Sequence, residues 1–257
     1  MVRGLYAAAA GMMTIQEQTA TTSNNLANAD TTGFKADLLL FTSAPGINTW
    51  RVDDPTTLDD AGRKRPEYIG LTNAGVMDTA IWHDFSQGQL VHTGQPLDVA
   101  IVGPGFLRVR EASSEYYSRD GELKRGADGF LTDNQGRRVQ GLGGDINVGT
   151  AASVEINRSG EVYADGVLID RLAIASFADP QADLTKVGTS LWRAAAAPTA
   201  TGAVSVQSGF IERSNVDAIS SIVELIAQLR HYEAAQRVVV TEDSMLGIAA
   251  SQIGKLT

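Results

Sequence analysis

Few residues in this chain could do chemistry, and they do not gather in its sequence. Three histidines lie in three different stretches, so a metal site would need an accidental convergence in the fold. We expect these side chains at the surface or at strand edges: His83, His92 and His231. The absence of cysteine excludes disulfides, thiol catalysis and thiolate metal sites. Phosphate-binding, nucleophile-elbow, zinc-protease and dinucleotide motifs are absent as well, so neither an enzyme nor a cofactor is predicted.

Acidic residues come nearest to forming a site. The segment DGELKRGADGFLTDNQG, residues 120–136, places Asp120, Asp128 and Asp133 beside glycines, as a calcium-binding loop does. It lacks the spacing and the closing glutamate of such a loop, and two consecutive hairpin turns explain it better. Two further pairs of carboxylates are interpreted as solvated loop residues: Glu111 with Glu115, and Asp53 with Asp54.

The densest polar cluster is SNNLANADTTGFK, residues 23–35. Its asparagines, Asn24, Asn25 and Asn28, favour local bonds to the backbone over a helix interior. Gly33 can adopt the left-handed conformation that ends helices. We therefore interpret the cluster as the exit of a helix, where short side chains satisfy the last carbonyls, and not as a catalytic site.

Composition narrows the class of protein. The 257 residues are 43% hydrophobic, which suits a folded chain of one large domain or one domain with appendages. The net charge is −9, and residues 63–65 form the one basic cluster, so a nucleic-acid partner is disfavoured. The sequence has no run of 18 or more apolar residues, so it predicts no membrane-spanning helix.

The N-terminus contains LYAAAAGMM, residues 5–13, which resembles the apolar part of a secretory signal. The apolar spacing continues well beyond this stretch, in steps of three and four, through Leu5, Ala8, Met12, Ile15, Thr19, Thr22 and Leu26. A cleaved signal would not need this register. We predict a retained helix of about 24 residues, roughly 36 Å long.

A second, longer stripe ends the chain. Ser214 and Asn215 before Asp217 predict a capped helix start. The apolar stripe continues at steps of three and four through Ile222, Leu225, Leu229, Tyr232, Gln236, Val239, Asp243, Leu246, Ala250 and Ile253. A helix over 217–253 would be about 55 Å long. Its heptad spacing predicts a coiled-coil seam with two polar interruptions.

The middle of the chain predicts strands. Residues 36–66 are rich in turn formers and charges, and we predict an extended connector. From 67 to 213, short apolar or alternating runs are separated by the hairpin signals RDGE, ADGF, SGEV and ADGV. The predicted fold class is α+β, with long terminal helices forming a coiled-coil-like inner domain and a central, mostly antiparallel β domain. The predicted parts are an inner helix at 1–35, the connector, the β domain at 67–213 and an inner helix at 214–257.

Two terminal stripes need partners, in the same chain or in copies of it. Copies joined head to tail form rings or open helical filaments. The topology alone therefore favours an assembly subunit.

The sequence resembles the axial family of bacterial flagellar basal-body rod and hook proteins. SNNLANADTTGFK and the preceding LYAAAAGM are similar to the family's N-terminal signature. QPLDVAIVGPGF, residues 95–106, resembles its central motif, although Gln95 stands where asparagine is usual. YSRDGELKRGADGFLTDNQGRRVQG (117–141) and GFIERSNVDAISSIVELIAQLRHYEAAQRVVVTEDSML (209–246) complete the likeness in the same order.

The resemblance implies a structural subunit that is exported unfolded, without a cleaved signal, and stacks into a hollow tube. The tube carries torque from motor to hook and leaves a channel for export. The implied partners are copies of itself, other axial proteins, the flagellar export apparatus and the surrounding ring bushing, with no nucleic acid and no small-molecule substrate. The implied location is the basal body, outside the cytoplasmic membrane. The length favours a rod subunit over a hook or hook-junction subunit, and it does not separate proximal from distal rod.

The residues expected at subunit interfaces come from both stripes and from the helix exit: Leu5, Met12, Ile15, Leu26, Asn24, Asn25, Asn28, Gly33, Phe34, Ile222, Leu225, Leu229, Tyr232, Val239, Leu246 and Ile253. Two other classes stay open. One is a secreted β-domain binding protein or enzyme with paired terminal helices, which would need a preformed polar pocket. The other, a membrane-surface protein, is disfavoured because the first helix lacks a basic face.

Overall fold

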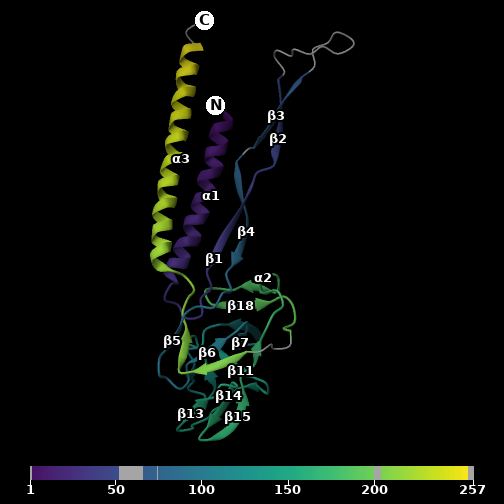
Figure 1. Ribbon diagram of the computed structural model, residues 1–257, viewed down its shortest axis with the longest axis vertical. Coiled ribbons are helices and arrows are strands. Elements are labelled where there is room, and N and C mark those ends of the chain that lie inside the picture. The colour runs from purple at the N-terminus through teal and green to yellow at the C-terminus, as the bar shows by residue number, and fades with distance from the viewer. Residues whose placement is uncertain (1, 52–65, 74, 200–203, 254–257) are drawn as a thin grey trace. The chain divides into compact units, whose positions relative to one another are not determined.

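The computed structural model describes residues 2–51, 66–73, 75–199 and 204–253, and Figure 1 shows its elements. It has a long helix at each end of the chain and antiparallel strands between them, which confirms the α+β class. The helices are α1 Val2–Ala27, α2 Pro180–Asp183 and α3 Ala218–Ile253.

The described residues between the terminal helices form twenty strands. The first ten are β1 Asp37–Ser43, β2 Gly46–Arg51, β3 Glu67–Asn73, β4 Val76–His83, β5 Leu90–His92, β6 Val99–Val102, β7 Phe106–Glu111, β8 Ser114–Ser118, β9 Lys124–Arg125 and β10 Leu131–Thr132. The others are β11 Arg138–Gly141, β12 Gly144–Asp145, β13 Val154–Ile156, β14 Glu161–Ala164, β15 Val167–Arg171, β16 Ile174–Ala175, β17 Leu184–Lys186, β18 Leu191–Ala194, β19 Ser205–Ser208 and β20 Phe210–Glu212.

The chain divides into two compact units. The helix–ribbon unit comprises Met1–Ser23, Leu38–Trp82 and Ile222–Thr257, and the β unit comprises Asn24–Asp37 and His83–Ser221. The ribbon consists of β1 beside β4 and β2 beside β3. Residues 37–51 of the predicted connector are therefore paired strands, whereas residues 52–65, with Asp53, Asp54 and the basic cluster, lie outside the described residues. The domain boundary expected at residue 67 falls within this ribbon.

The β unit is built on one large antiparallel sheet. Its strands follow the order β17-β18-β8-β7-β11-β10-β9, with β12 paired to β11 and β16 to β7. A three-stranded sheet, β13-β14-β15, adds to it. The last two strands return to early ones, because β19 pairs with β6 and β20 with β5. Segments from both ends of the chain thus complete this unit.

Two apolar clusters fill the β unit. The larger collects branched side chains of the central strands, among them Val109, Val139 and Val162, which have no exposed surface. The smaller is aromatic and surrounds Trp192, which is also fully buried. Alternation along β7, whose Phe106 and Leu107 are buried on opposite faces, shows that this sheet is covered on both sides.

The turn signals predict most hairpins. ADGV joins β14 to β15, where Asp165 and Gly166 both have positive φ, as a two-residue hairpin of the primed type requires. SGEV covers the end of the turn between β13 and β14 and the first two residues of β14, and ADGF lies between β9 and β10. RDGE is the exception: residues 119–122 join no paired strands, so this prediction is wrong. The second turn of the 120–136 segment lies instead at residues 133–137, between β10 and β11.

Both predicted terminal helices form, but the residue that caps the second one differs from the prediction. All seven members of the N-terminal stripe are buried or half-buried in α1, which confirms its register. The start of α3 is capped by Asp217, whose Oδ1 accepts from the backbone N–H of Ile219 at 3.0 Å. Ser214 and Asn215 do not cap it. The Ser214 hydroxyl accepts from Val216 N–H, and Asn215 binds other segments of the β unit.

Candidate functional site: assembly surfaces and a buried ionic group

In the helix–ribbon unit, α1 and α3 run antiparallel, side by side (Figure 1). Two hydrogen bonds between their described side chains join them. The Gln228 amide donates to the Thr22 hydroxyl at 2.9 Å, and both side chains are buried. Gln18 donates to the Glu224 carboxylate at 3.4 Å. In the described part of this unit these two, Thr22 and Gln228, are the buried side chains, and no apolar side chain is buried.

The half-buried positions of α3 follow a strict heptad. Large residues recur every seven positions at Leu225, Tyr232, Val239 and Leu246, and small or polar residues lie between them. Four members of the predicted stripe thus face the rest of the unit. Ile222, Leu229, Gln236, Asp243 and Ala250 are exposed instead, and the Ile253 side chain lies outside the described residues. The heptad agrees with a coiled-coil seam, which itself stays a prediction.

The opposite side of α3 is apolar and open. Ile222, Val223, Ile226 and Leu229 are 46–62% exposed and follow one another at helical spacing. Val240 and Ile248 continue this free face toward the C-terminus. Contiguous exposed apolar side chains of this kind mark interaction surfaces. Within one chain the free face of α3 stays exposed.

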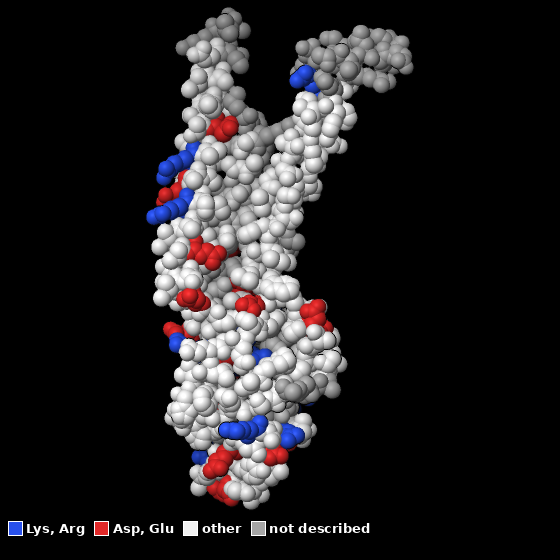
Figure 2. Space-filling view, viewed as in Figure 1, with Lys and Arg blue, Asp and Glu red and all other residues white. Residues whose placement is uncertain are grey.

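The ribbon has the same character. Its large apolar side chains are 40–65% exposed: Leu38, Leu40, Phe41, Ile47, Trp50, Tyr68, Ile69, Leu71, Val76, Met77, Ile81 and Trp82. Figure 2 shows few charged side chains over strands β1–β4 on the visible face. A two-stranded ribbon is at best marginally stable in water. Contact with α1 supports it where the Thr14 hydroxyl approaches the Val76 carbonyl oxygen at 3.4 Å and where Gly75 packs close to Ala10.

The polar cluster at residues 23–35 is a helix exit, as the sequence indicates. The Asn25 side chain binds the backbone of Asp37 at both its N–H and its carbonyl, at 2.9 and 2.7 Å. The Asn28 amide donates to the Asn24 carbonyl oxygen at 2.8 Å and so closes the last turn of α1. Asn25 and Asn28 are therefore buried within the chain's own fold, and Asn24 remains exposed.

Gly33 and Phe34 turn the chain into the β unit. Gly33 has φ +68°, and a Cβ there would lie 2.3 Å from the carbonyl carbon of Arg119, so the position strongly favours glycine. Phe34 is fully buried, and the Lys186 ammonium lies 4.1 Å from the centre of its ring. Their expected contact with neighbouring subunits stays a prediction, whereas their role inside the chain is now defined.

Three buried charges meet behind this turn. The Lys35 ammonium lies 2.6 Å from Glu212 Oε1, and Arg119 Nη1 lies 3.0 Å from Glu212 Oε2. All three side chains are at most 3% exposed. Burial lowers the pKa of Lys35 and of Arg119, and the Glu212 carboxylate offsets part of that effect. We call Lys35, Arg119 and Glu212 the buried triad.

A second ionic group lies at the start of β1. Asp37 accepts from the Lys186 ammonium at 2.8 Å and lies 2.7 Å from His83 Nδ1. Burial alone would raise the pKa of Asp37, but the hydrogen bonds from His83 and Lys186 outweigh it and hold this pKa below its usual value. His83 is the last residue of β4, which fits the expected strand-edge position, although its side chain is only 13% exposed. His92 and His231 are exposed, as expected.

The remaining candidates for chemistry serve the fold. Asp133 accepts from Arg137 Nε at 2.6 Å and from backbone N–H groups of its own turn. Asp128 pairs with Arg138, and Glu115 pairs with Arg108. Glu111 is exposed at the end of β7. In the described residues no group of three or more histidines and carboxylates could hold a metal ion.

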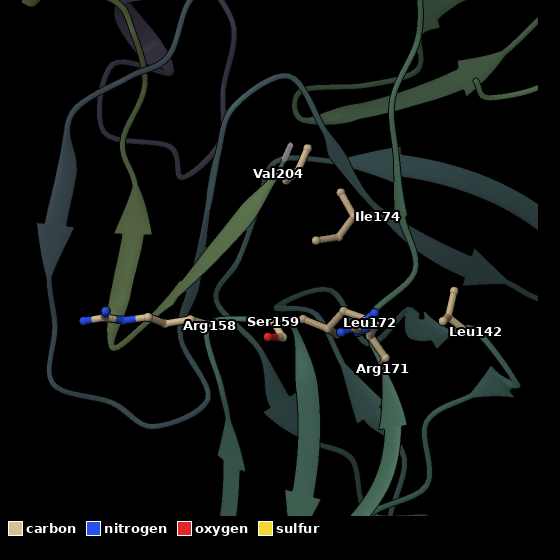
Figure 3. Close-up of a pocket in the computed structure, with 7 residues that line it drawn as sticks. All are labelled: Leu142, Arg158, Ser159, Arg171, Leu172, Ile174 and Val204. Carbon is tan, nitrogen blue, oxygen red and sulfur yellow. The ribbon is translucent and has the colours of Figure 1, made fainter. Parts of the chain in front are cut away.

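A shallow depression on the β unit is lined by seven residues: Leu142, Arg158, Ser159, Arg171, Leu172, Ile174 and Val204. Figure 3 shows that Arg158 points away from the others. Arg171 approaches Glu161 at 3.5 Å, so its charge is already partnered. Neither a carboxylate nor an imidazole lines this depression, so a nucleophile–base pair does not form here.

The described surfaces define a class of protein, an assembly subunit. Its β unit has a buried apolar core, whereas the described residues of its helix–ribbon unit expose apolar side chains on α3 and on the ribbon. No described helix is long and apolar enough to cross a membrane.

Comparison with known proteins agrees with this class. Family models match in chain order: flagella basal body rod protein at residues 5–35, the flagellar hook protein FlgE/F/G D1 domain at 100–164, and the flagellar basal body rod FlgEFG protein C-terminal region at 207–253. The chain is 33% identical to the flagellar basal-body rod protein FlgG of Agrobacterium fabrum, over 98% of this chain and 100% of that one. It is 28% identical to FlgF of Caulobacter vibrioides over both full lengths. The chain belongs to the flagellar basal-body rod protein family.

Sequence reasoning did not find the buried triad. Its members come from three separate stretches, TTGFK, YSRDGE and GFIERSN, and each looks like an ordinary turn or strand-edge charge. The three stretches are among those that carry the resemblance to the rod family. That coincidence is a weak signal, because no spacing along the chain relates residues 35, 119 and 212.

Proposed function

We propose that this protein is a structural subunit of the flagellar rod that stacks with copies of itself and with other axial proteins into a hollow, torque-carrying tube. One observation supports this most directly. The helix–ribbon unit buries no apolar side chain among its described residues, although it exposes long apolar surfaces on α3 and on β1–β4. Stacking supplies the missing interior.

The energetic argument is simple. Apolar surface removed from water contributes about 25 cal/mol per Å². The exposed apolar side chains on the free face of α3 and on the ribbon would gain this free energy when another subunit covers them. The hydrogen bond between Gln228 and Thr22 contributes little to the stability of the unit. Identical subunits that bury different patches against each other generate an open helical filament when the rotation does not close.

The proposed interface differs in detail from the apolar stripe. Ile222 and Leu229 are free for neighbouring subunits, together with Val223 and Ile226. Leu5, Met12 and Ile15 on α1, like the heptad residues Leu225, Tyr232, Val239 and Leu246 of α3, are half-buried within the chain and reach full burial on stacking. Leu26 is half-buried in the β unit.

The wider setting follows from the family. We infer that the subunit lies outside the cytoplasmic membrane, within the basal body, and that it is delivered by the flagellar export apparatus. We also infer that the rod it forms lies inside the ring bushing. The names of the similar proteins include both FlgG and FlgF, so the segment of the rod is left open.

The test is assembly of a folded subunit with one charged side chain on the free face. Ile226→Glu should leave urea unfolding of the β unit unchanged and abolish filament formation and motility in a strain that lacks the native subunit. The matched control is Leu168→Glu, because Leu168 is similarly exposed, at 52% against 46%, but lies on the β unit. Normal filaments from Ile226→Glu would contradict the proposed interface.

Limited proteolysis gives an independent measurement. In dilute monomer the helix–ribbon unit should be trimmed quickly, because its elements lack a core, and the β unit should resist. Assembled protein should resist throughout. Equal resistance of both units in the monomer would remove the main support for this proposal and would direct attention to the second class, a β-domain binding protein.

A further inference from the structure

The buried triad joins three parts of the chain that are far apart in sequence. Lys35 follows the exit of α1, Arg119 follows β8, and Glu212 ends β20 shortly before α3 begins. Glu212 is the shared partner, because its two carboxylate oxygens bind the two cations separately. Its backbone carbonyl also accepts from Gly33 N–H at 2.8 Å.

Further hydrogen bonds fix each member. The Lys35 ammonium also donates to the Ser86 carbonyl oxygen at 2.6 Å, and Glu212 Oε1 accepts from Gly88 N–H at 2.9 Å. Arg119 donates to the Gly103 carbonyl oxygen at 2.8 Å, and its guanidinium lies 5.0 Å from the centre of the Phe106 ring. Side chains so connected cannot leave one at a time without exposing a buried, unpaired charge to the interior.

A buried ionic group is a poor source of net stability. Replacing such a group by apolar side chains of similar volume is often neutral or favourable. Removing one member of a buried ionic group is costly, because the remaining charges stay buried without an opposite charge beside them. A contact that is neutral at equilibrium and costly to break is well suited to resist force.

We propose that the buried triad is the force-bearing junction through which both terminal helices are anchored to the β unit. This proposal rests on the proposed function, since a rod subunit must pass torque between its inner helices and the rest of its mass. The segment from α1 and the segment to α3 are tied to each other and to Arg119, so a load on either helix reaches the β unit through both.

A surface ion pair between the same two segments supplies an internal comparison. Arg213 pairs with Asp30. Arg213 directly follows Glu212 of the triad in the sequence, and Asp30 shortly precedes Lys35. These side chains are 45% and 88% exposed, against 1% and 0% for Glu212 and Lys35. Because water screens the exposed pair, it should bear almost no load.

The experiment pulls on the full-length monomer. The chain has no cysteine, so handles can be attached at two introduced ones. Ser23, Ala152 and Ala227 are exposed and suit this purpose. The pair Ser23→Cys and Ala152→Cys loads the exit of α1 against the β unit. The pair Ala152→Cys and Ala227→Cys loads the entry to α3.

In the wild-type background we expect each geometry to rupture the β unit in one cooperative event. Glu212→Gln should raise the rupture rate at constant load at least about tenfold in both geometries. Arg213→Gln should change it by less than about threefold. Separate, sequential release of the two segments in the wild-type background, or an unchanged rate in Glu212→Gln, would overturn the junction.

An apolar triple variant separates force resistance from stability. Lys35→Met, Arg119→Met and Glu212→Met together should leave urea unfolding near that of the wild type and still rupture faster under load. Rupture as slow as in the wild type would show that ionic contacts are not what bears force. If Glu212→Gln does not fold, this variant and the wild-type pulling record decide the matter. Monomer pulling does not depend on filament formation, so failure of the junction and failure of the proposed function are distinguishable.

Discussion

The two units of this protein use apolar residues in opposite ways. The β unit buries them in two clusters and, in the described chain, exposes few large ones: Leu142, Val167, Leu168, Ile169 and Ile219. Among its described residues, the helix–ribbon unit leaves its large apolar side chains exposed or half-buried, and its fully buried side chains are Thr22 and Gln228. The β unit therefore forms its apolar core within one chain. The helix–ribbon unit instead presents apolar side chains that a second subunit could bury.

The largest contrast should come from tryptophans. Trp192 is fully buried between the rings of His83 and Phe85, each 4.8 Å away, so Trp192→Ala should cost about 3–5 kcal/mol of unfolding free energy. Trp50 is 52% exposed beside Tyr68, so Trp50→Ala should cost about 1 kcal/mol or less. Urea unfolding of dilute monomer, followed by far-UV circular dichroism, measures both. Equal losses would mean that the ribbon already has a core.

Gly33→Ala should come next, with a loss of about 3 kcal/mol. Its backbone is left-handed, and the added Cβ would meet the backbone of Arg119 at 2.3 Å. Gly136 has φ +81° with no atom within 4 Å of such a Cβ, so Gly136→Ala should cost only about 1 kcal/mol. The same urea titration compares them. If the two losses match, close packing at the helix exit contributes nothing beyond backbone strain.

A pH-dependent effect of intermediate size is expected from Asp120. Burial raises the pKa of Asp120 to about 6, and the charges of Glu122 and Asp133 add to this. A folded pKa above the ordinary value of 3.8 means that the stability from this group is present below about pH 4 and is lost as pH rises to about 6. Asp120→Asn should therefore stabilise the protein by about 2 kcal/mol at pH 7.5 and leave it nearly unchanged at pH 4. An equal shift at both pH values would contradict the titration.

The smallest effect should have the opposite sign to that of Gly33→Ala. Gly11 lies inside α1 with no atom within 4 Å of an added Cβ, so Gly11→Ala should stabilise the monomer by up to about 1 kcal/mol. Thermal unfolding followed at 222 nm measures this. Destabilisation by Gly11→Ala would reveal a tight contact on α1 and would weaken the contrast between the units.

Local patterns in the sequence predicted much of the fold. The stripe from Leu5 to Leu26 has the period of one helix face, and Asp165–Gly166 supplies the positive φ values that a two-residue hairpin needs. Both signals depend on residues that are close along the chain. The RDGE prediction was wrong because the same composition serves a buried segment, where Arg119 and Asp120 turn inward.

The stripe of α3 was only partly interpretable for a different reason. Apolar residues occupy more than one face of this helix, so periodicity alone could not say which face meets the chain and which stays free. The structure places the Leu225 face inward and leaves Ile222 and Leu229 exposed.

The sequence by itself determined the helices at both ends, the antiparallel β region and, through its resemblance, the rod family. These follow from short-range periodicity, turn chemistry and long matching stretches. Only the tertiary structure decided that Lys35, Arg119 and Glu212 share one buried site, and that Asp37 meets Lys186. The physical reason is that ion pairing depends on distance in space, and the folded β unit brings together charges that no sequence spacing relates.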